Sequence, residues 1–241
     1  MTTWFETLTE YAEQRLTPRV EQELYSRGVT DDQARSFRIG YIDRIPDLGG
    51  NDDFLQWAKG KSLQDMMVFP LTTTLGEIRG FQFRSVDRGR KIYLDYMPYK
   101  EEAVSFGLAQ AMQQVWTGGD VWLVEGVFDL LPLQRQVPNI VATLTARVPE
   151  LMLRVLRRLV DTIWLGYDAD LAGQTAITQF MKNHGKEFRV LPVYYPKVKV
   201  VGSDRYIKDP GELWEVWGDD QLRDFVQTLL KSHNPPEFFN A

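Results

Sequence analysis

The segment WLGYDADLAG (residues 164–173) places two aspartates, one residue apart, directly after an apolar run. The apolar run predicts a buried strand, and the segment LAGQTAITQFMKNHG (171–185) that follows predicts a helix. Asp is a poor strand former and is costly to bury without a partner. The two carboxylates therefore mark the point at which a strand of the core ends, and their presence there needs an explanation.

The same alternation of strand and helix extends on both sides of this segment. Three further strands are predicted, namely VWLVEG (121–126), NIVATL (139–144) and FRVLPVYY (188–195), with helical stretches between them and a last helix at 219–232. Nearly continuous apolar strands that alternate with helices are typical of a parallel sheet covered on both faces. The second half of the chain is therefore predicted to be α/β.

The first half has a different pattern. Residues 4–38 are predicted to be helical and residues 39–55 to form a loop. Three short strands rich in Val, Ile, Phe and Tyr are predicted at 66–71, 77–85 and 91–96, with a hairpin link at 72–77 and a helix at 105–116. We expect a mixed α+β unit with a small antiparallel sheet in front of the parallel one.

The composition excludes several classes of site. The chain has 241 residues, 44% of them hydrophobic, a net charge of −5 and no cysteine. Disulfides, thiolate zinc sites and cysteine nucleophiles are therefore excluded, and the two histidines, His184 and His233, are too far apart to suggest a zinc site. No apolar run reaches the roughly 20 residues of a membrane helix, and no signal peptide is evident. We expect a cytoplasmic protein without zinc and without a membrane partner.

Acidic residues follow three of the four predicted parallel strands. Glu125 and Asp129 follow the first strand, Asp168 and Asp170 the third, and Asp209 the fourth. Ligands of open parallel sheets bind at the carboxyl ends of the strands. Carboxylates that cluster there repel each other unless a cation neutralises them, and hard oxygen ligands suit Mg²⁺ or Mn²⁺. The pattern indicates phosphoryl-transfer chemistry with bound metal.

Each motif alone has a simpler interpretation. An isolated Asp-x-Asp is commonly a helix N-cap, and Asp170 stands where it would cap the helix that follows. The order of the motifs at the ends of successive strands favours the functional interpretation.

Three segments resemble the acidic motifs of the Toprim domain of DnaG-type primases: EGVFD (125–129), YDADLAG (167–173) and KDPGEL (208–213). The segments at 24–42, 67–85, 91–96 and 106–111 follow the order of the N-terminal subdomain of these primases. The resemblance covers residues 20 to 230. It implies a primase subdomain at 1–118, a Toprim core at 119–200, and the last acidic motif with a C-terminal helix at 201–241.

The resemblance also implies roles for the acids. Glu125, Asp168 and Asp170 would be catalytic, and with Asp129 and Asp209 they would hold one to three Mg²⁺ or Mn²⁺ ions. The family has a second aspartate in its last motif, where this chain has Gly211, and Glu212 is the adjacent acid.

Five basic residues match the template- and nucleotide-binding ridge of the family: Arg27, Arg84, Arg90, Lys91 and Lys100. Arg90 and Lys91 compete for one position of the family pattern. A cluster in the strand region, made up of Arg84, Arg88, Arg90, Lys91 and Lys100, fits a phosphate-binding stripe and also fits a solvated hairpin edge that discourages aggregation.

The implied function is that of a DNA primase, a DNA-directed RNA polymerase that makes short RNA primers on single-stranded DNA from NTPs. A replicative helicase and a separate zinc-binding protein are the partners that this function implies. Departures from the bacterial consensus favour a phage origin, and then the host cytoplasm as the location. The alternatives are a Toprim-family nuclease that activates water, and a non-catalytic module derived from a primase.

Overall fold

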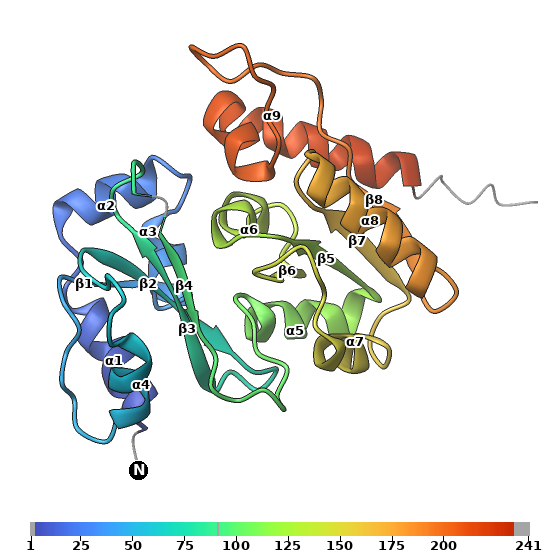
Figure 1. Cartoon of the computed structure of the whole chain (residues 1–241). Coiled ribbons are helices and arrows are strands. Elements are labelled where there is room, and N and C mark those ends of the chain that lie inside the picture. The colour runs from blue at the N-terminus through green and yellow to red at the C-terminus, as the bar shows by residue number, and fades with distance from the viewer. Residues whose placement is uncertain (1–2, 91, 234–241) are drawn as a thin grey trace, which may run out of the picture.

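The computed structural model describes residues 3–90 and 92–233. Its first sheet is antiparallel, with the order β1-β2-β3-β4. The strands are β1 (Gly40–Ile42), β2 (Met66–Thr72), β3 (Ile78–Ser85) and β4 (Tyr93–Tyr96). Figure 1 shows this sheet in blue and green, with the N-terminal helices beside it.

Threonine caps start the first three helices, α1 (Trp4–Glu13), α2 (Pro18–Tyr25) and α3 (Asp31–Ser36). Thr3, Thr17 and Thr30 each accept a hydrogen bond from a backbone N–H of the first turn, which satisfies a donor that the helix itself cannot pair. A fourth helix, α4 (Asp52–Ala58), precedes β2.

The second sheet is parallel, with the order β6-β5-β7-β8. Its strands are β5 (Asp120–Val124), β6 (Ile140–Ala142), β7 (Thr162–Gly166) and β8 (Arg189–Pro192). The helices are α5 (Leu108–Gly118), α6 (Val127–Gln134), α7 (Glu150–Leu156), α8 (Leu171–His184) and α9 (Pro210–His233). The predicted combination of an antiparallel and a parallel sheet is confirmed.

The two sheets share a hydrophobic core. One cluster of buried side chains contains Phe69 of β2, Phe128 of α6 and Trp122 of β5. The rings of Phe69 and Phe128 meet edge to face, with centroids 5.4 Å apart. Trp122 stacks on Trp164 of the neighbouring strand at 4.9 Å and 12°. This shared core fixes the position of one sheet relative to the other, while the predicted boundaries after residues 118 and 200 stay a prediction.

The structure corrects the prediction at three places. Residues 39–55 are not all loop, because β1 pairs with β2 and α4 begins at Asp52. The helix predicted at 219–232 is present, but α9 also contains a helical segment before it that was not predicted, which begins at Pro210 and is separated from it by a break at Gly218, where φ is +70°. The strand predicted at 188–195 is shorter, and the residues after it form a hairpin that the sequence pattern did not indicate. These elements are short or interrupted by glycine, so hydrophobic periodicity could not predict their boundaries.

No helix in the described part of the chain is both long enough and apolar enough to cross a bilayer.

The shared core predicts a large cost for removing its central side chain. Trp122 is fully buried, so Trp122→Ala should lower the free energy of unfolding by about 3–5 kcal/mol. Leu75, 86% exposed in the link between β2 and β3, is the control, and Leu75→Ala should change stability by less than about 0.5 kcal/mol. Urea unfolding measures both values, and equal costs for the two variants would contradict the packing described.

Candidate active site

Two of the predicted acids meet at the carboxyl ends of β5 and β7. The strands pair in parallel with Val124 opposite Gly166, so the residues just beyond them lie at one edge of the sheet. Glu125 follows β5 directly, and its Oε1 accepts a hydrogen bond of 3.1 Å from the backbone N–H of Asp168. The sheet register thus brings Glu125 and Asp168 together.

Two more acids, Asp129 and Asp209, lie at the starts of helices. Asp129 is in the first turn of α6 and accepts a hydrogen bond of 2.8 Å from the N–H of Gly126. Asp209 precedes α9 and accepts one of 2.7 Å from the N–H of Glu212. Backbone donors therefore hold both carboxylates in place.

Gly211 lies against both of these carboxylates. A Cβ atom at this position would be 3.4 Å from an oxygen of Asp129 and 3.4 Å from an oxygen of Asp209. It would also be 2.8 Å from the backbone oxygen of Phe128, which cannot move aside as a flexible side chain could. The close packing of α6 against α9 therefore leaves no room for the aspartate that the resemblance led us to look for here.

Burial and mutual repulsion disfavour the charged forms of these acids. Burial, with the charges of Asp209 and Asp168 added, raises the pKa of Asp129 well above its ordinary value. Burial raises the pKa of Asp209 to about 6. The pKa of Glu125 is raised by burial and by the charge of Asp168. The cluster is thus a place where added positive charge is favoured.

Lys208 supplies one such charge. Its ammonium group forms an ion pair with Oδ2 of Asp168 and lies 3.5 Å from Oδ2 of Asp209. Burial alone would lower the pKa of Lys208, but the hydrogen bond and charge of Asp168 outweigh burial and raise it. The ammonium group therefore stays charged and partly neutralises the acids.

Arginines of the N-terminal half face the acids. Arg84 of β3 is buried, and burial lowers its pKa. Its guanidinium lies over the rings of Tyr93 at 4.3 Å and Phe128 at 5.1 Å, and its Nε has no hydrogen-bond partner among the described residues. Arg27 lies over Phe128 at 4.3 Å. Arg27 and Arg84 are called here the basic wall; stacking on aromatic rings orients guanidinium groups for planar anions.

A polar cleft of about 580 Å³ separates the acids from the basic wall. Its lining includes four predicted acids and two predicted bases: Glu125, Asp129, Asp168, Asp209, Arg27 and Arg84. The cleft therefore brings six of the ten predicted site residues together.

The other four predicted residues do not line this cleft. Asp170 caps α8, with its Oδ1 3.0 Å from the N–H of Gly173, as the simpler interpretation of its motif predicts. Arg90 donates a hydrogen bond of 2.9 Å to Ser62 and lines a small adjoining pocket. Lys100 is exposed in the segment after β4. Lys91 lies outside the described residues.

The cleft also contains residues other than the ten predicted site residues, among them Arg88 of the basic cluster. Gln82 and Tyr93 share the face of β3 and β4 that carries Arg84, because β-strand side chains alternate and Arg84 pairs with Tyr93. That period of two was visible in the sequence. Arg88 and Arg205 line the cleft from loops, and periodicity carries no such signal for loops.

The acids could bind a hard divalent cation whose remaining ligands come from a substrate. Across residues 3–90 and 92–233, no three carboxylate or histidine side chains converge closely enough to bind one ion by themselves. Mg²⁺ commonly takes one or two carboxylates and completes its shell with water and substrate phosphates. The buried, mutually repelling oxygens of Asp129, Asp168 and Asp209 fit that mode of binding.

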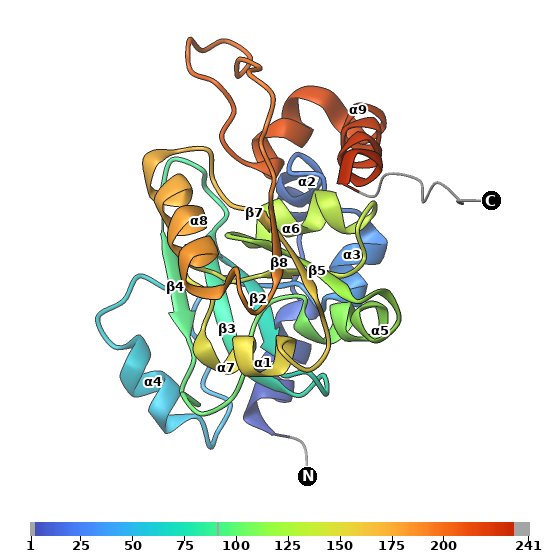
Figure 2. The ribbon, with the colours of Figure 1, turned by 90° about the vertical axis from the view of Figure 1, so that its right-hand side faces the viewer.

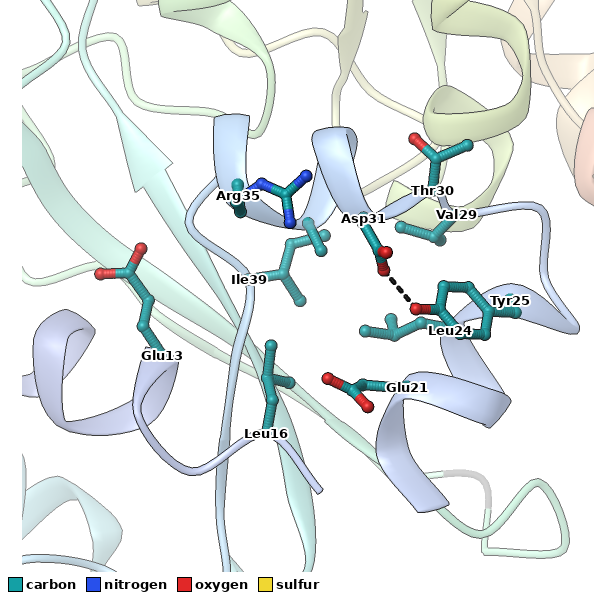
Figure 3. A pocket seen from close by; sticks show the side chains of 11 residues that line it. Glu13, Leu16, Glu21, Leu24, Tyr25, Val29, Thr30, Asp31, Arg35 and Ile39 are labelled. Atoms are coloured by element: carbon teal, nitrogen blue, oxygen red, sulfur yellow. Dashed lines mark hydrogen bonds between the residues drawn. The ribbon is translucent and has the colours of Figure 1, made fainter. Parts of the chain in front are cut away.

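A second cavity lies among α1, α2 and α3 and is much smaller, at about 120 Å³ (Figure 3). Leu16, Leu24 and Ile39 form an apolar floor, and Tyr25 at the rim donates a hydrogen bond to Asp31. It contains none of the ten predicted site residues, so the larger cleft is the candidate active site.

Comparison with known proteins agrees with the site. The family described as Toprim-like matches residues 122–204, which run from within β5 through β7 and β8 into the segment before α9. A DNA primase of Treponema pallidum is 28% identical over 232 residues, covering 87% of this chain and 36% of that protein. A DNA primase of Aquifex aeolicus is 28% identical over 255 residues, covering 92% of this chain and 49% of that protein. The chain thus spans less than half the length of either relative.

A solved structure of a DnaG primase catalytic domain bound to single-stranded DNA has the same fold. It superposes with a TM-score of 0.69 and 20% sequence identity, covering 96% of this chain and 81% of that one. These similarities agree with the order of the two sheets and with the acids at the strand ends. The chain is therefore similar in sequence to DNA primases, contains a Toprim-like segment, and has the fold of the DnaG primase catalytic domain.

Proposed function

We propose that this protein is a DNA primase core, a nucleotidyltransferase that makes short RNA primers on single-stranded DNA. The observation that carries the proposal is the single cleft in which Glu125, Asp168 and Asp209 face Arg27 and Arg84. Polymerising nucleotides requires a site for triphosphate charge beside a site that activates a hydroxyl group. The two walls supply these two environments.

The basic wall would bind the phosphates of the incoming nucleotide. Arg84 is held by contacts of its guanidinium with Tyr93 and Phe128, and its side chain lines the cleft. In a buried site a charge-assisted hydrogen bond from arginine to phosphate is strong and directional. This arrangement would align the α-phosphate with the acids opposite.

The acids would act on the attacking 3′-hydroxyl. Bound Mg²⁺ or Mn²⁺, held by Asp168, Asp129 and Asp209 with substrate phosphates, would lower the pKa of that hydroxyl and neutralise the departing pyrophosphate. Glu125, whose pKa is raised by burial, is placed to accept the proton. The hydroxyl oxygen then bonds to the α-phosphorus as the bond to pyrophosphate breaks.

The template would be single-stranded DNA, and a solved DnaG primase catalytic domain with this fold is bound to single-stranded DNA. A replicative helicase and a separate zinc-binding protein are proposed as partners on the resemblance alone.

The proposal predicts that Asp168→Asn abolishes primer synthesis. The assay contains mixed-sequence single-stranded DNA, labelled NTPs and Mn²⁺, and the loss should be at least about 100-fold, the effect of removing a preorganised electrostatic group. Asp161→Asn is the matched control, since Asp161 is exposed at the other end of the same strand. It should retain wild-type activity.

The same assay separates the alternatives. Cleavage of the template by the wild-type protein, without RNA products, would favour a nuclease. Binding of DNA with neither reaction would favour a non-catalytic module. Full primer synthesis by Asp168→Asn would refute the assignment of the acids.

The basic wall predicts a loss of triphosphate affinity in Arg84→Gln. Isothermal titration calorimetry should show a Kd for ATP that is at least about tenfold higher, because hydrogen bonds to charged groups contribute about 1.5–3 kcal/mol. Arg79→Gln on the same strand is the control, since Arg79 pairs with Glu77 and Glu102 and does not line the cleft. An equal effect of the two substitutions would show that Arg84 does not contact the nucleotide.

The raised pKa of Asp209 predicts a pH-dependent gain in stability for Asp209→Asn when divalent ions are chelated. Because the pKa of this carboxyl group is higher in the folded than in the unfolded state, the free energy of unfolding falls as pH rises from about 4 through about 6. Asparagine avoids this loss. The variant should therefore match the wild type near pH 4 and exceed it by up to about 3 kcal/mol at pH 7.5, at about 1.4 kcal/mol per pKa unit.

Thermal and urea unfolding at several pH values would measure this difference. Mn²⁺ should then stabilise the wild type more than Asp209→Asn, since only the wild type keeps the carboxylate. A difference that does not change with pH would contradict the burial of this acid.

A further inference from the structure

A β-hairpin (residues 196–207) connects β8 to α9. The N–H of Val200 donates a hydrogen bond of 3.0 Å to the oxygen of Arg205, and the N–H of Ile207 donates one of 2.8 Å to the oxygen of Val198. Lys199 and Tyr206 pair opposite each other. The turn contains Gly202 with a φ of +74°, which favours glycine. Figures 1 and 2 show this segment in orange, projecting from the body of the molecule in both views.

The two faces of the hairpin differ in chemistry. Val198 and Val200 pack against the shared hydrophobic core. The alternate residues Lys197 and Lys199 are exposed, and Tyr206, opposite Lys199, is 54% exposed. Tyr194, just before the hairpin, is 73% exposed. We call the surface formed by Lys197, Lys199 and Tyr206 the outer face.

The charge of the hairpin is opposite to that of the whole protein. It contains three basic residues and one acidic residue, in a chain with a net charge of −5. Lys199 lies 2.9 Å from the carboxylate of Asp204, but both groups are exposed, and such a pair exchanges readily for another anion. Lys197 forms no ion pair with a residue in the described ranges. Both ammonium groups are therefore available to a ligand.

Aggregation resistance alone would account for the lysines, which commonly protect exposed strands. It does not account for the exposed ring of Tyr206 on the same face, because exposed aromatic rings favour association. Lysines that flank exposed aromatic rings are the combination by which proteins bind single-stranded nucleic acid: the cations contact phosphates and the rings stack on unpaired bases.

The hairpin also lies beside the candidate active site. Arg205 in its second strand and Lys208 just after it line the cleft. Arg205, which directly follows the turn, forms an ion pair of 2.7 Å with Glu212, so this part of the hairpin is fixed to the start of α9. The hairpin is therefore at the rim of the cleft.

We propose that the outer face binds the single-stranded template outside the catalytic cleft, with Lys197 and Lys199 contacting phosphates and Tyr206 stacking on bases. This inference rests on the proposed primase function, because it takes single-stranded DNA to be the polymer in the cleft. It adds a binding surface that is separate from the acids and from the basic wall.

The first test is the charge-reversed variant Lys197→Glu/Lys199→Glu. Fluorescence anisotropy with a labelled single strand of about 20 nucleotides should show at least tenfold weaker binding than the wild type at moderate salt. The slope of log affinity against log salt should fall by about 1.4, the value for two phosphate contacts on a single strand. The matched control is Lys182→Glu/Lys186→Glu, which makes the same change of charge at the end of α8 farthest from the acids.

Tyr206→Ala tests the stacking contribution without a change of charge. It should weaken binding of the single strand about fivefold or more and leave binding of a blunt duplex unchanged, since paired bases cannot stack on the ring. Both variants alter exposed side chains, and their circular dichroism should match that of the wild type.

The outcomes separate this inference from the proposed function. If the wild type binds single-stranded DNA and makes primers, but the hairpin variant binds as tightly as the α8 control, the inference is wrong and the proposed function stands. If Tyr206→Ala weakens duplex and single strand equally, the stacking role is wrong. If the wild type binds no DNA and makes no primer, both proposals fail.

Discussion

The structure of the site depends on the repulsion among carboxylates at a buried edge of the parallel sheet. Asp129 and Asp209 are packed on either side of Gly211, where burial raises the pKa of both. Asp168 adds a third charge, which Lys208 partly offsets. Such a cluster destabilises the folded protein unless positive charge is added, so we interpret it as a site kept for binding cations and phosphates rather than for stability.

The fold holds this unfavourable arrangement in place by ordinary means. Parallel pairing of β5 with β7 aligns Glu125 with Asp168, and backbone N–H groups at the starts of α6 and α9 hold Asp129 and Asp209. The antiparallel sheet presents Arg84 from the other side. Because the two sheets share one hydrophobic core, the distance between the acids and the arginines is set by packing and does not depend on a flexible linker.

The sequence predicted the elements with strong periodicity and the acids that follow them. The apolar strands β5 and β7 and the position of Glu125 and Asp168 could be read from residues 120–170, because strand ends coincide with the change from apolar to acidic residues. The sequence did not predict β1, which is only three residues long, or the hairpin after β8. It also could not place Arg90 or Lys100 outside the cleft, since a side chain's distance from a site depends on tertiary packing.

The central claim is that the crowded acids bind a divalent ion together with substrate phosphates. The most direct measurement is the anomalous diffraction of a crystal of this protein grown with Mn²⁺ and a non-hydrolysable nucleoside triphosphate. The account predicts a manganese peak in contact with the carboxylate of Asp168 or Asp209 and with a phosphate oxygen, and a Lys208 ammonium displaced from Asp168. A nucleotide bound with no manganese at these carboxylates, and with the ion pair of Lys208 unchanged, would contradict it.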